Sequence, residues 1–166
     1  MFDLRRLVHL GKSERPPAGE QGAGAALAVD PVRLVAITDK PDDYGALQQI
    51  ATGYRWKISI VASSNAAIAC LNEQPTPLVI CDRDLTGEDW REVLARIAAL
   101  PQAVCVLLAS RVVDDYLWRQ VIRNHGYDVV SKPFQPEELR RAVTFAWSWR
   151  GWAHRHYMGS VRNPTA

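Results

Sequence analysis

Residues 78–90 read Leu-Val-Ile-Cys-Asp-Arg-Asp-Leu-Thr-Gly-Glu-Asp-Trp, and the rest of the chain is organised around them. Four apolar residues are followed abruptly by Asp82 and Asp84, and a turn containing glycine then leads into a helical pattern. The pattern predicts a buried β-strand with carboxylates at its carboxyl end. Because ligands of open parallel sheets bind at the carboxyl ends of the strands, we expect Asp82 at the functional edge.

Short apolar runs and helix-compatible segments alternate on both sides of this stretch. Strands are expected over residues 32–38, 57–62, 77–82, 103–109 and 129–130. Helices are expected over residues 41–54, from a cap at Ser64 or Asn65 to Leu71, and over 89–100, 114–124 and 137–157. Strands that are apolar on both faces and are joined by helices indicate a parallel sheet covered on both sides, an α/β doubly wound domain.

Two of these helices show their inward faces in the sequence. Residues 89–100 place five apolar side chains near the i, i+3, i+4, i+7 spacing of one buried face: Trp90, Val93, Leu94, Ile97 and Leu100. In residues 114–124 the side chains expected to face inward are Leu117, Val121 and Ile122. Both helices should therefore cover the sheet.

Length and composition favour one intracellular domain. A chain of 166 residues can bury a sizeable core without disulfides, and a net charge of +2 is too small to imply a nucleic-acid partner. Cys70, Cys81 and Cys105 lie in apolar neighbourhoods without metal-ligand spacing, which is typical of core residues in a reducing cytosol. No apolar run approaches the roughly 18 residues of a membrane span. We therefore expect a cytoplasmic protein.

The first 31 residues differ in character from the rest of the chain. They are rich in Gly, Pro and Ala and lack apolar periodicity, so a flexible N-terminal tail is expected over residues 1–31. Gly22 and Gly24 do not follow a predicted strand, which argues against a phosphate-binding loop there.

Polar groups end four of the five predicted strands. Asp39 follows the first strand, Asp82 the third, Ser110 the fourth and Lys132 the fifth. Since the carboxyl ends of parallel strands lie at one edge of a sheet, these side chains should converge there. Two carboxylates, a hydroxyl and an ammonium suit a Mg²⁺ ion together with a phosphoryl group.

This ordered set, Thr38-Asp39, Asp82, Ser110 and Lys132-Pro133, resembles the receiver domain of two-component response regulators over about residues 33–149. The resemblance implies a flavodoxin-like strand order 2-1-3-4-5. It makes Asp82 the phosphoacceptor, and Asp39, Asp82 and the backbone carbonyl of Asp84 the ligands of Mg²⁺. Ser110 and Lys132 would bind the phosphoryl oxygens, and the Lys132–Pro133 bond would be cis.

The resemblance also predicts how the chain works. Residues 32–150 would form the receiver and residues 151–166 a C-terminal helix extension and tail. A histidine kinase or phosphotransfer protein would phosphorylate Asp82, and the only chemistry of the chain itself would be this Mg²⁺-dependent self-phosphorylation and later hydrolysis. With no DNA-binding domain attached and no direct DNA binding expected, a stand-alone receiver would signal through a partner or a homodimer. The contact face would comprise the fourth helix, fifth strand and fifth helix.

Four positions depart from the pattern of the family. Thr38 replaces the first of two acidic residues, Arg111 a small residue, Val129 an aromatic switch residue and Thr86 a proline. Of these, Thr38, Arg111 and Val129 favour an alternative hypothesis, a pseudo-receiver that acts as a protein-interaction or dimerisation module without phosphorylation. A flavin- or nucleotide-binding enzyme is disfavoured because no glycine- or hydroxyl-rich loop follows the first strand.

The last predicted helix carries two stripes. One is aromatic and follows i, i+4, i+7, i+11: Phe145, Trp149, Trp152 and His156. The other should face the core: Leu139, Val143 and Ala146. Basic residues and no acidic residue follow Glu138. The aromatic stripe is either a docking or dimerisation surface, or it covers the core or packs on the N-terminal tail. A membrane-surface role is disfavoured because the stretch is short.

Overall fold

The computed structural model describes the backbone of residues 31–74 and 76–157 and the side chains of these residues as far as Ser148. Residues 1–30 of the predicted N-terminal tail and residues 158–166 of the predicted C-terminal tail lie outside the described residues. No helix among the described residues is long and apolar enough to cross a membrane.

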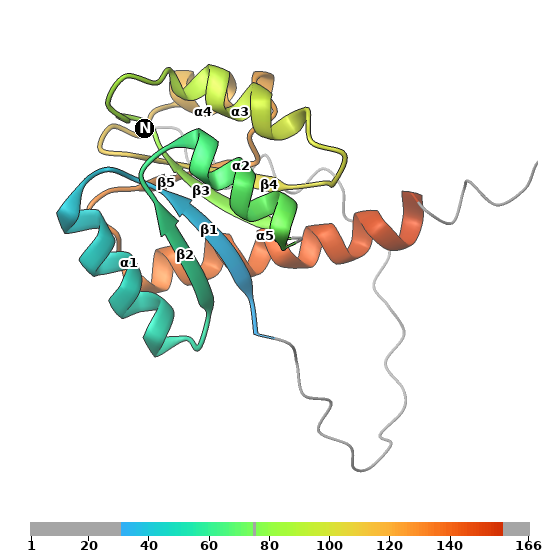
Figure 1. Cartoon of the computed structure of the whole chain (residues 1–166), viewed down its shortest axis with the longest axis horizontal. Helices are drawn as coiled ribbons and strands as arrows, with labels where there is room; N and C mark the ends of the chain where they lie inside the picture. The colour runs from blue at the N-terminus through green and yellow to red at the C-terminus, as the bar shows by residue number, and fades with distance from the viewer. Residues whose placement is uncertain (1–30, 75, 158–166) are drawn as a thin grey trace, which may run out of the picture. The chain divides into compact units, whose positions relative to one another are not determined.

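A parallel sheet of five strands forms the centre of the fold (Figure 1). Its strands are β1 (Arg33–Ile37), β2 (Lys57–Val61), β3 (Leu78–Asp82), β4 (Cys105–Ser110) and β5 (Asp128–Ser131). Their order in the sheet is β2-β1-β3-β4-β5, and every neighbouring pair is parallel. The predicted strand order 2-1-3-4-5 is confirmed.

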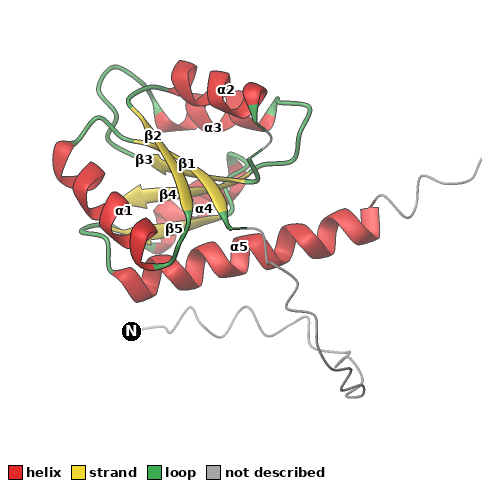
Figure 2. Cartoon of the chain, turned by 60° about the horizontal axis from the view of Figure 1, so that its bottom comes forward, coloured by secondary structure: helices red, strands yellow, loops and turns green. Residues whose placement is uncertain are grey.

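Five helices alternate with the strands and cover both faces of the sheet (Figure 2). They are α1 (Pro41–Gly53), α2 (Ser64–Glu73), α3 (Trp90–Ala98), α4 (Asp115–Arg123) and α5 (Pro136–Tyr157). Helices α1 and α5 lie on one face, and α2, α3 and α4 lie on the other (Figures 1 and 2). The predicted doubly wound α/β class is therefore confirmed.

Two apolar layers hold the helices to the sheet because successive side chains of a strand point to opposite faces. In β1, Val35 and Ile37 pack in the layer of α2, α3 and α4, whereas Leu34 and Ala36 pack in the layer of α1 and α5. The other central strands alternate in the same way. This explains why these strands read as continuous apolar runs in the sequence.

Side-chain caps fix where three helices begin. Asp89 and Asp114 cap α3 and α4, and the Oδ1 atom of Asp114 accepts a hydrogen bond of 2.7 Å from the Leu117 amide. The cap of α2 is Ser63, whose Oγ accepts from the Ala66 amide at 3.3 Å. The prediction of Ser64 or Asn65 was wrong by one or two residues, because three hydroxyl or amide side chains in succession can all serve as caps.

Most of the predicted inward faces are confirmed. Leu117 and Val121 of α4 are buried, but Ile122 is 42% exposed, so its predicted inward position was wrong. Five residues beyond Leu117, Ile122 is turned well away from the buried side of the helix. On α5 the expected core stripe is buried: Leu139, Val143 and Ala146.

The aromatic stripe of α5 is described only in part. Phe145 is 68% exposed. The side chains of Trp149, Trp152 and His156 lie outside the described residues. The three cysteines contribute to the two apolar layers, as predicted: Cys70, Cys81 and Cys105.

Candidate functional site

The carboxyl ends of the strands bring together most of the predicted polar side chains. Asp82 is the last residue of β3, Thr38 directly follows β1, and Lys132 directly follows β5. Their exposed fractions are only 1% for Asp82, 7% for Thr38 and 8% for Lys132. Ionised groups are rarely buried to this degree unless they are paired. The arrangement is therefore a buried polar site within an otherwise apolar domain.

Lys132 lies directly beside Asp82. Its Nζ atom is 2.8 Å from Asp82 Oδ2, and the Lys132–Pro133 bond that positions it is cis, as expected. Burial alone would lower the pKa of Lys132, but hydrogen bonds to Asp43 and Asp82 outweigh burial and raise this pKa above its usual value. The ammonium is thus charged and forms a buried ion pair with Asp82.

Asp43 is a member of the site that sequence reasoning missed. It lies in the first turn of α1, is 8% exposed, and its Oδ2 atom is 2.6 Å from Lys132 Nζ. A signal was present: Asp43 precedes the buried residues Leu47 and Ile50 at i+4 and i+7. An acidic residue in line with a buried apolar stripe indicates a buried partner of opposite charge.

Thr38 joins the two carboxylates. Its Oγ1 atom is 3.2 Å from Asp43 Oδ2 and 3.4 Å from Asp82 Oδ2, and the single hydroxyl proton can serve one of them at a time. The other oxygen of the acceptor, Asp82 Oδ1, accepts from the Asp84 amide at 3.0 Å. Both oxygens of Asp82 are therefore hydrogen-bonded despite their burial.

Asp39 belongs to a neighbouring group of contacts. Its Oδ2 atom accepts from the Thr86 amide at 3.0 Å, and Lys40 Nζ lies 2.8 Å from its Oδ1 atom. The Lys40 ammonium and the Thr86 donors hold the pKa of Asp39 well below its usual range. Although Lys40 is close, the buried Oδ1 atom accepts no well-directed hydrogen bond from the described residues. Asp39 therefore stays ionised, and Lys40 is paired with its Oδ1 atom.

The donors for a divalent cation are few but suitable. Among the described residues, no three acidic, His or Cys side chains are grouped to hold a metal ion. Mg²⁺ commonly takes one or two carboxylates and completes its shell with water and phosphate. Asp39 and Asp82 could serve as these carboxylates once Lys40 leaves Asp39.

Ser110 is close to the site but is directed elsewhere. Its hydroxyl donates to the Val112 carbonyl at 2.7 Å and accepts from the Val112 amide at 3.2 Å and from Arg83 Nη1 at 3.4 Å. It makes no hydrogen bond to Asp82 among the contacts that the structure describes. Arg111 is exposed, and Val129 is partly buried against the layer of α2, α3 and α4.

A second polar network lies beside the loop that follows Asp82. Glu88 accepts from the Ser64 amide at 3.0 Å and from the Ser64 hydroxyl, and Arg96 Nη1 donates to Ser64 Oγ at 2.6 Å. Ser64 is fully buried. Sequence reasoning missed this network because its members come from three separate elements. It anchors the loop between β3 and α3 to the start of α2.

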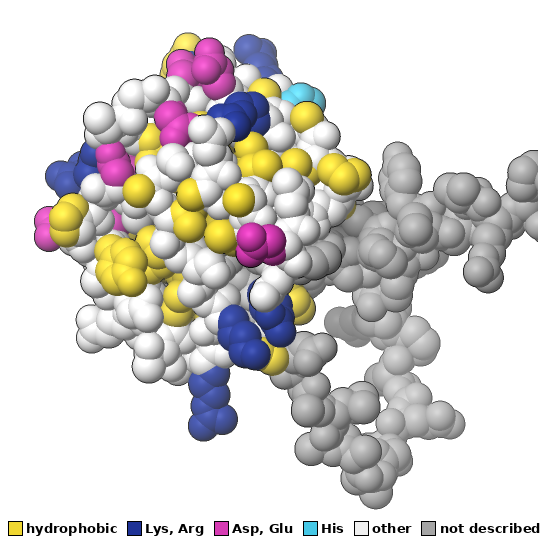
Figure 3. All heavy atoms as spheres, viewed as in Figure 1, with side chains coloured by type: hydrophobic (Ala, Val, Ile, Leu, Met, Phe, Trp, Pro, Cys, Tyr) yellow, Lys and Arg dark blue, Asp and Glu magenta, His cyan; other side chains and the backbone are white. Residues whose placement is uncertain are grey.

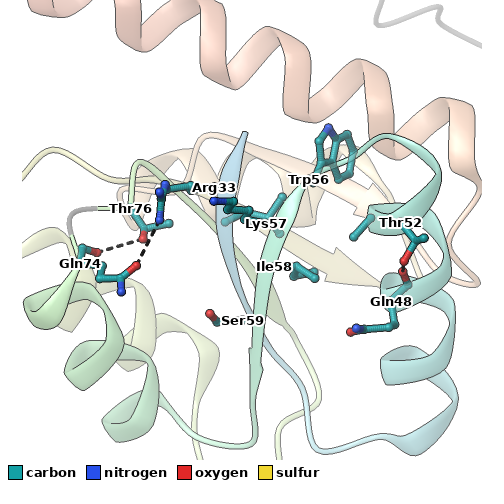
Figure 4. Close-up of a pocket in the computed structure, with 11 residues that line it drawn as sticks. Arg33, Gln48, Thr52, Trp56, Lys57, Ile58, Ser59, Gln74 and Thr76 are labelled. Atoms are coloured by element: carbon teal, nitrogen blue, oxygen red, sulfur yellow. Dashed lines mark hydrogen bonds between the residues drawn. The ribbon is translucent and has the colours of Figure 1, made fainter. Parts of the chain in front are cut away.

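The pocket in Figure 4 lies at the opposite end of β1 and β2 from the strand tips. Its volume is about 400 Å³, and Figure 4 shows the hydrogen bond of 3.2 Å from Arg33 to Gln74 at its rim. Arg33 and Lys57 line this pocket. Figure 3 shows Lys and Arg side chains gathered over the end of the sheet where β1 and β2 begin. Among the residues that the structure describes, no carboxylate lines this pocket, and none of its lining residues belongs to the site around Asp82.

Comparison with known protein families decides the assignment. The model of the response regulator receiver domain matches residues 34–144, which include Thr38, Asp39, Asp82, Ser110 and Lys132. The chain belongs to the response regulator receiver domain family. The predicted resemblance to two-component receivers is thereby confirmed.

Individual relatives agree with this receiver assignment. The chain is 29% identical over 103 residues to the C4-dicarboxylate transport transcriptional regulatory protein DctD of Rhizobium meliloti. The match covers 62% of this chain but only 22% of DctD, so the receiver spans about a fifth of that relative.

Solved structures share the fold of this receiver. The signal receiver domain of an HD domain-containing protein from Pseudomonas fluorescens has a TM-score of 0.70 at 20% identity and covers 81% of this chain and 99% of its own. The receiver domain of Ssk1 from Saccharomyces cerevisiae, in complex with the histidine phosphotransfer protein Ypd1, has a TM-score of 0.61 at 14% identity. That match covers 69% of this chain and 87% of the other.

Proposed function

We propose that this receiver accepts a phosphoryl group on Asp82 from a histidine kinase or a phosphotransfer protein. The observation that carries the proposal is the buried Asp82 carboxylate with the Lys132 ammonium 2.8 Å from its Oδ2 atom. A carboxylate oxygen is the nucleophile, and a fixed ammonium stabilises the charge of a transferring phosphoryl group. The complex of the similar receiver Ssk1 with Ypd1 supports a phosphotransfer partner.

The proposed transfer step is a nucleophilic substitution at phosphorus. An Asp82 oxygen attacks the phosphorus of a phosphohistidine, and the bond between phosphorus and the histidine nitrogen breaks with its electron pair going to that nitrogen. The product is an acyl phosphate on Asp82. Later attack by water on the phosphorus releases inorganic phosphate and restores the carboxylate. A Mg²⁺ ion held by Asp39, Asp82 and the Asp84 carbonyl would supply positive charge against the phosphoryl oxygens.

Output is proposed to pass through the face that α4, β5 and α5 form. Several large apolar side chains are exposed there or on the preceding loop: Val112, Val113, Tyr116, Trp118, Ile122 and Phe145. Exposed apolar groups that are clustered mark protein interaction sites. After phosphorylation, Ser110 would leave the Val112 backbone for a phosphoryl oxygen, which couples the site to the start of this face. That the receiver acts without an attached output domain stays a prediction.

A pseudo-receiver is the second candidate function. Asp82 is 1% exposed, Ser110 is bonded to its own loop, and Lys40 lies on the carboxylate that would bind the metal. Each of these contacts must open before a phosphoryl group can be accommodated. If they stay closed, the domain would serve only as an interaction module.

Acetyl phosphate with Mg²⁺ provides the test that separates the two functions. Wild-type protein should gain the mass of one phosphoryl group, and Asp82→Asn should gain none. Asp84→Asn is the matched control, because Asp84 is exposed and contributes only its backbone to the proposed site. No adduct on the wild type, either with acetyl phosphate or with a phosphorylated phosphotransfer protein, would favour the pseudo-receiver.

A further inference from the structure

Three buried charged side chains share one hydrogen-bonding group at the strand tips. The Lys132 ammonium lies 2.6 Å from Asp43 Oδ2 and 2.8 Å from Asp82 Oδ2. The Thr38 hydroxyl lies 3.2 and 3.4 Å from the same two oxygens. The two carboxylates therefore face each other across one ammonium and one hydroxyl.

Thr38 contributes a hydroxyl, and no carboxylate, to this group. Thr38 stands at the end of β1, where the family resemblance leads us to expect an acidic residue. A threonine hydroxyl brings no charge to Lys132 or to a cation. Asp43 reaches the same space from α1, and its carboxylate touches both Thr38 and Lys132.

We propose that Asp43 supplies the carboxylate that Thr38 lacks, so that the first turn of α1 provides the second counter-ion of Lys132. Asp43 acts as a positioning residue. It holds the ammonium beside Asp82 and keeps the site negative enough to attract a divalent cation. The proposal deepens the proposed phosphoacceptor function and rests on it only for the role of Lys132 toward a phosphoryl group.

The geometry argues for an action through Lys132 rather than through direct coordination of a metal. Asp43 directs its Oδ2 atom to Lys132 and Thr38, and no grouping of three metal-binding side chains occurs among the described residues. A buried negative charge near a cation site nevertheless raises the affinity for the cation, because the attraction between them is weakly screened there. Loss of the Asp43 charge should therefore weaken Mg²⁺ binding about tenfold.

The experiment removes the carboxylate at position 43 and places one at position 38 instead. The proteins to compare are wild type, Asp43→Asn, the double variant Thr38→Asp with Asp43→Asn, and the control Asp42→Asn. Asp42 is the exposed neighbour of Asp43 in the same helical turn. The first measurement is the Mg²⁺ dissociation constant from a titration followed by amide NMR shifts. The second is the NMR signal of the Lys132 ammonium at neutral pH, assigned with Lys132→Arg.

The expected pattern has three parts. Asp43→Asn raises the Mg²⁺ dissociation constant about tenfold and weakens or broadens the Lys132 signal, because the ammonium loses one of its two counter-ions. The double variant restores both measurements to near the wild-type values. Asp42→Asn changes neither. If Asp43→Asn does not fold, the double variant alone decides, since it must then fold and show both signals.

Three results would overturn the proposal. They are Mg²⁺ binding by Asp43→Asn that equals the wild type, a double variant that recovers neither measurement, and wild-type Mg²⁺ binding no tighter than that of Asp82→Asn. No phosphodonor enters these titrations. A failure of Asp82 to accept a phosphoryl group would therefore count against the proposed function and leave this test unchanged.

Discussion

Along β3, the side chains of Val79 and Asp82 are buried almost equally, with exposed fractions of 0% and 1%, but different interactions stabilise them. Val79 packs in an apolar layer, where many side chains of suitable size could serve as neighbours. Asp82 depends on specific groups: the ammonium of Lys132, the hydroxyl of Thr38 and the amide of Asp84. The body of the sheet therefore tolerates changes that its carboxyl edge does not.

The largest loss of stability is expected when the cation at the carboxyl edge is removed. Lys132→Met keeps a chain of similar length but leaves Asp43 and Asp82 buried together without their counter-ion. Removal of one partner of a buried pair costs about 3–5 kcal/mol in the free energy of unfolding. Urea denaturation should show this loss, and added Mg²⁺ should recover part of it by supplying another cation.

The matched control for this variant is Lys57→Met, which removes an exposed lysine from the edge strand β2. It should change the free energy of unfolding by less than about 0.5 kcal/mol. Equal losses from Lys57→Met and Lys132→Met would contradict the view that paired burial distinguishes the strand tips from the remainder of the sheet.

A substitution that leaves a cavity in the apolar layer should lower stability in a way that Mg²⁺ does not recover. Leu94 of α3 is 0% exposed, and Leu94→Ala should lower the free energy of unfolding by about 3 kcal/mol through lost burial and an unfilled cavity. Mg²⁺ should recover none of this loss, since no charge is affected. Leu100→Ala, at a partly buried position on the same layer, should cost clearly less. Recovery of Leu94→Ala by Mg²⁺ would remove the distinction between the two regions.

The same contrast explains which features the sequence predicted. Strand positions and the inward residues of α3 and α5 follow from apolar periodicity, which is a local property of the chain. The convergence of Asp82 and Lys132 followed from strand topology together with the family resemblance. Ile122 was misjudged because an apolar side chain next to a buried one need not share its face.

Two of the missed features depend on contacts between distant segments. The partners Asp43 and Lys132 are 89 residues apart, and Ser64 and Glu88 are 24 apart. No periodicity relates such pairs. The orientation of Ser110 toward Val112 was equally hidden, because the sequence places a hydroxyl at a strand tip without fixing its hydrogen-bond partner.

Asp128, at the start of β5, is a partly buried carboxylate without a paired cation, in contrast to Asp82. Its Oδ1 atom accepts from Trp118 Nε1 at 3.2 Å and from the Val129 amide at 2.8 Å, and no ion pair to it occurs among the described residues. Burial raises the pKa of Asp128, with a smaller contribution from Glu138. The ionised form is therefore less stable in the folded protein than in the unfolded chain.

Asp128→Asn should relieve this cost and keep an oxygen that accepts both hydrogen bonds. A folded-state pKa above the unfolded value of about 3.9 means that the cost is present at neutral pH and disappears as the pH falls below about 4. The variant should thus melt at a slightly higher temperature than the wild type at pH 7, and the difference should shrink toward zero near pH 4. Asp42→Asn, at an exposed site, should show no such trend. If the difference in melting temperature is the same at both pH values, or if the variant melts lower than the wild type at pH 7, the two hydrogen bonds offset the cost of burying the Asp128 carboxylate.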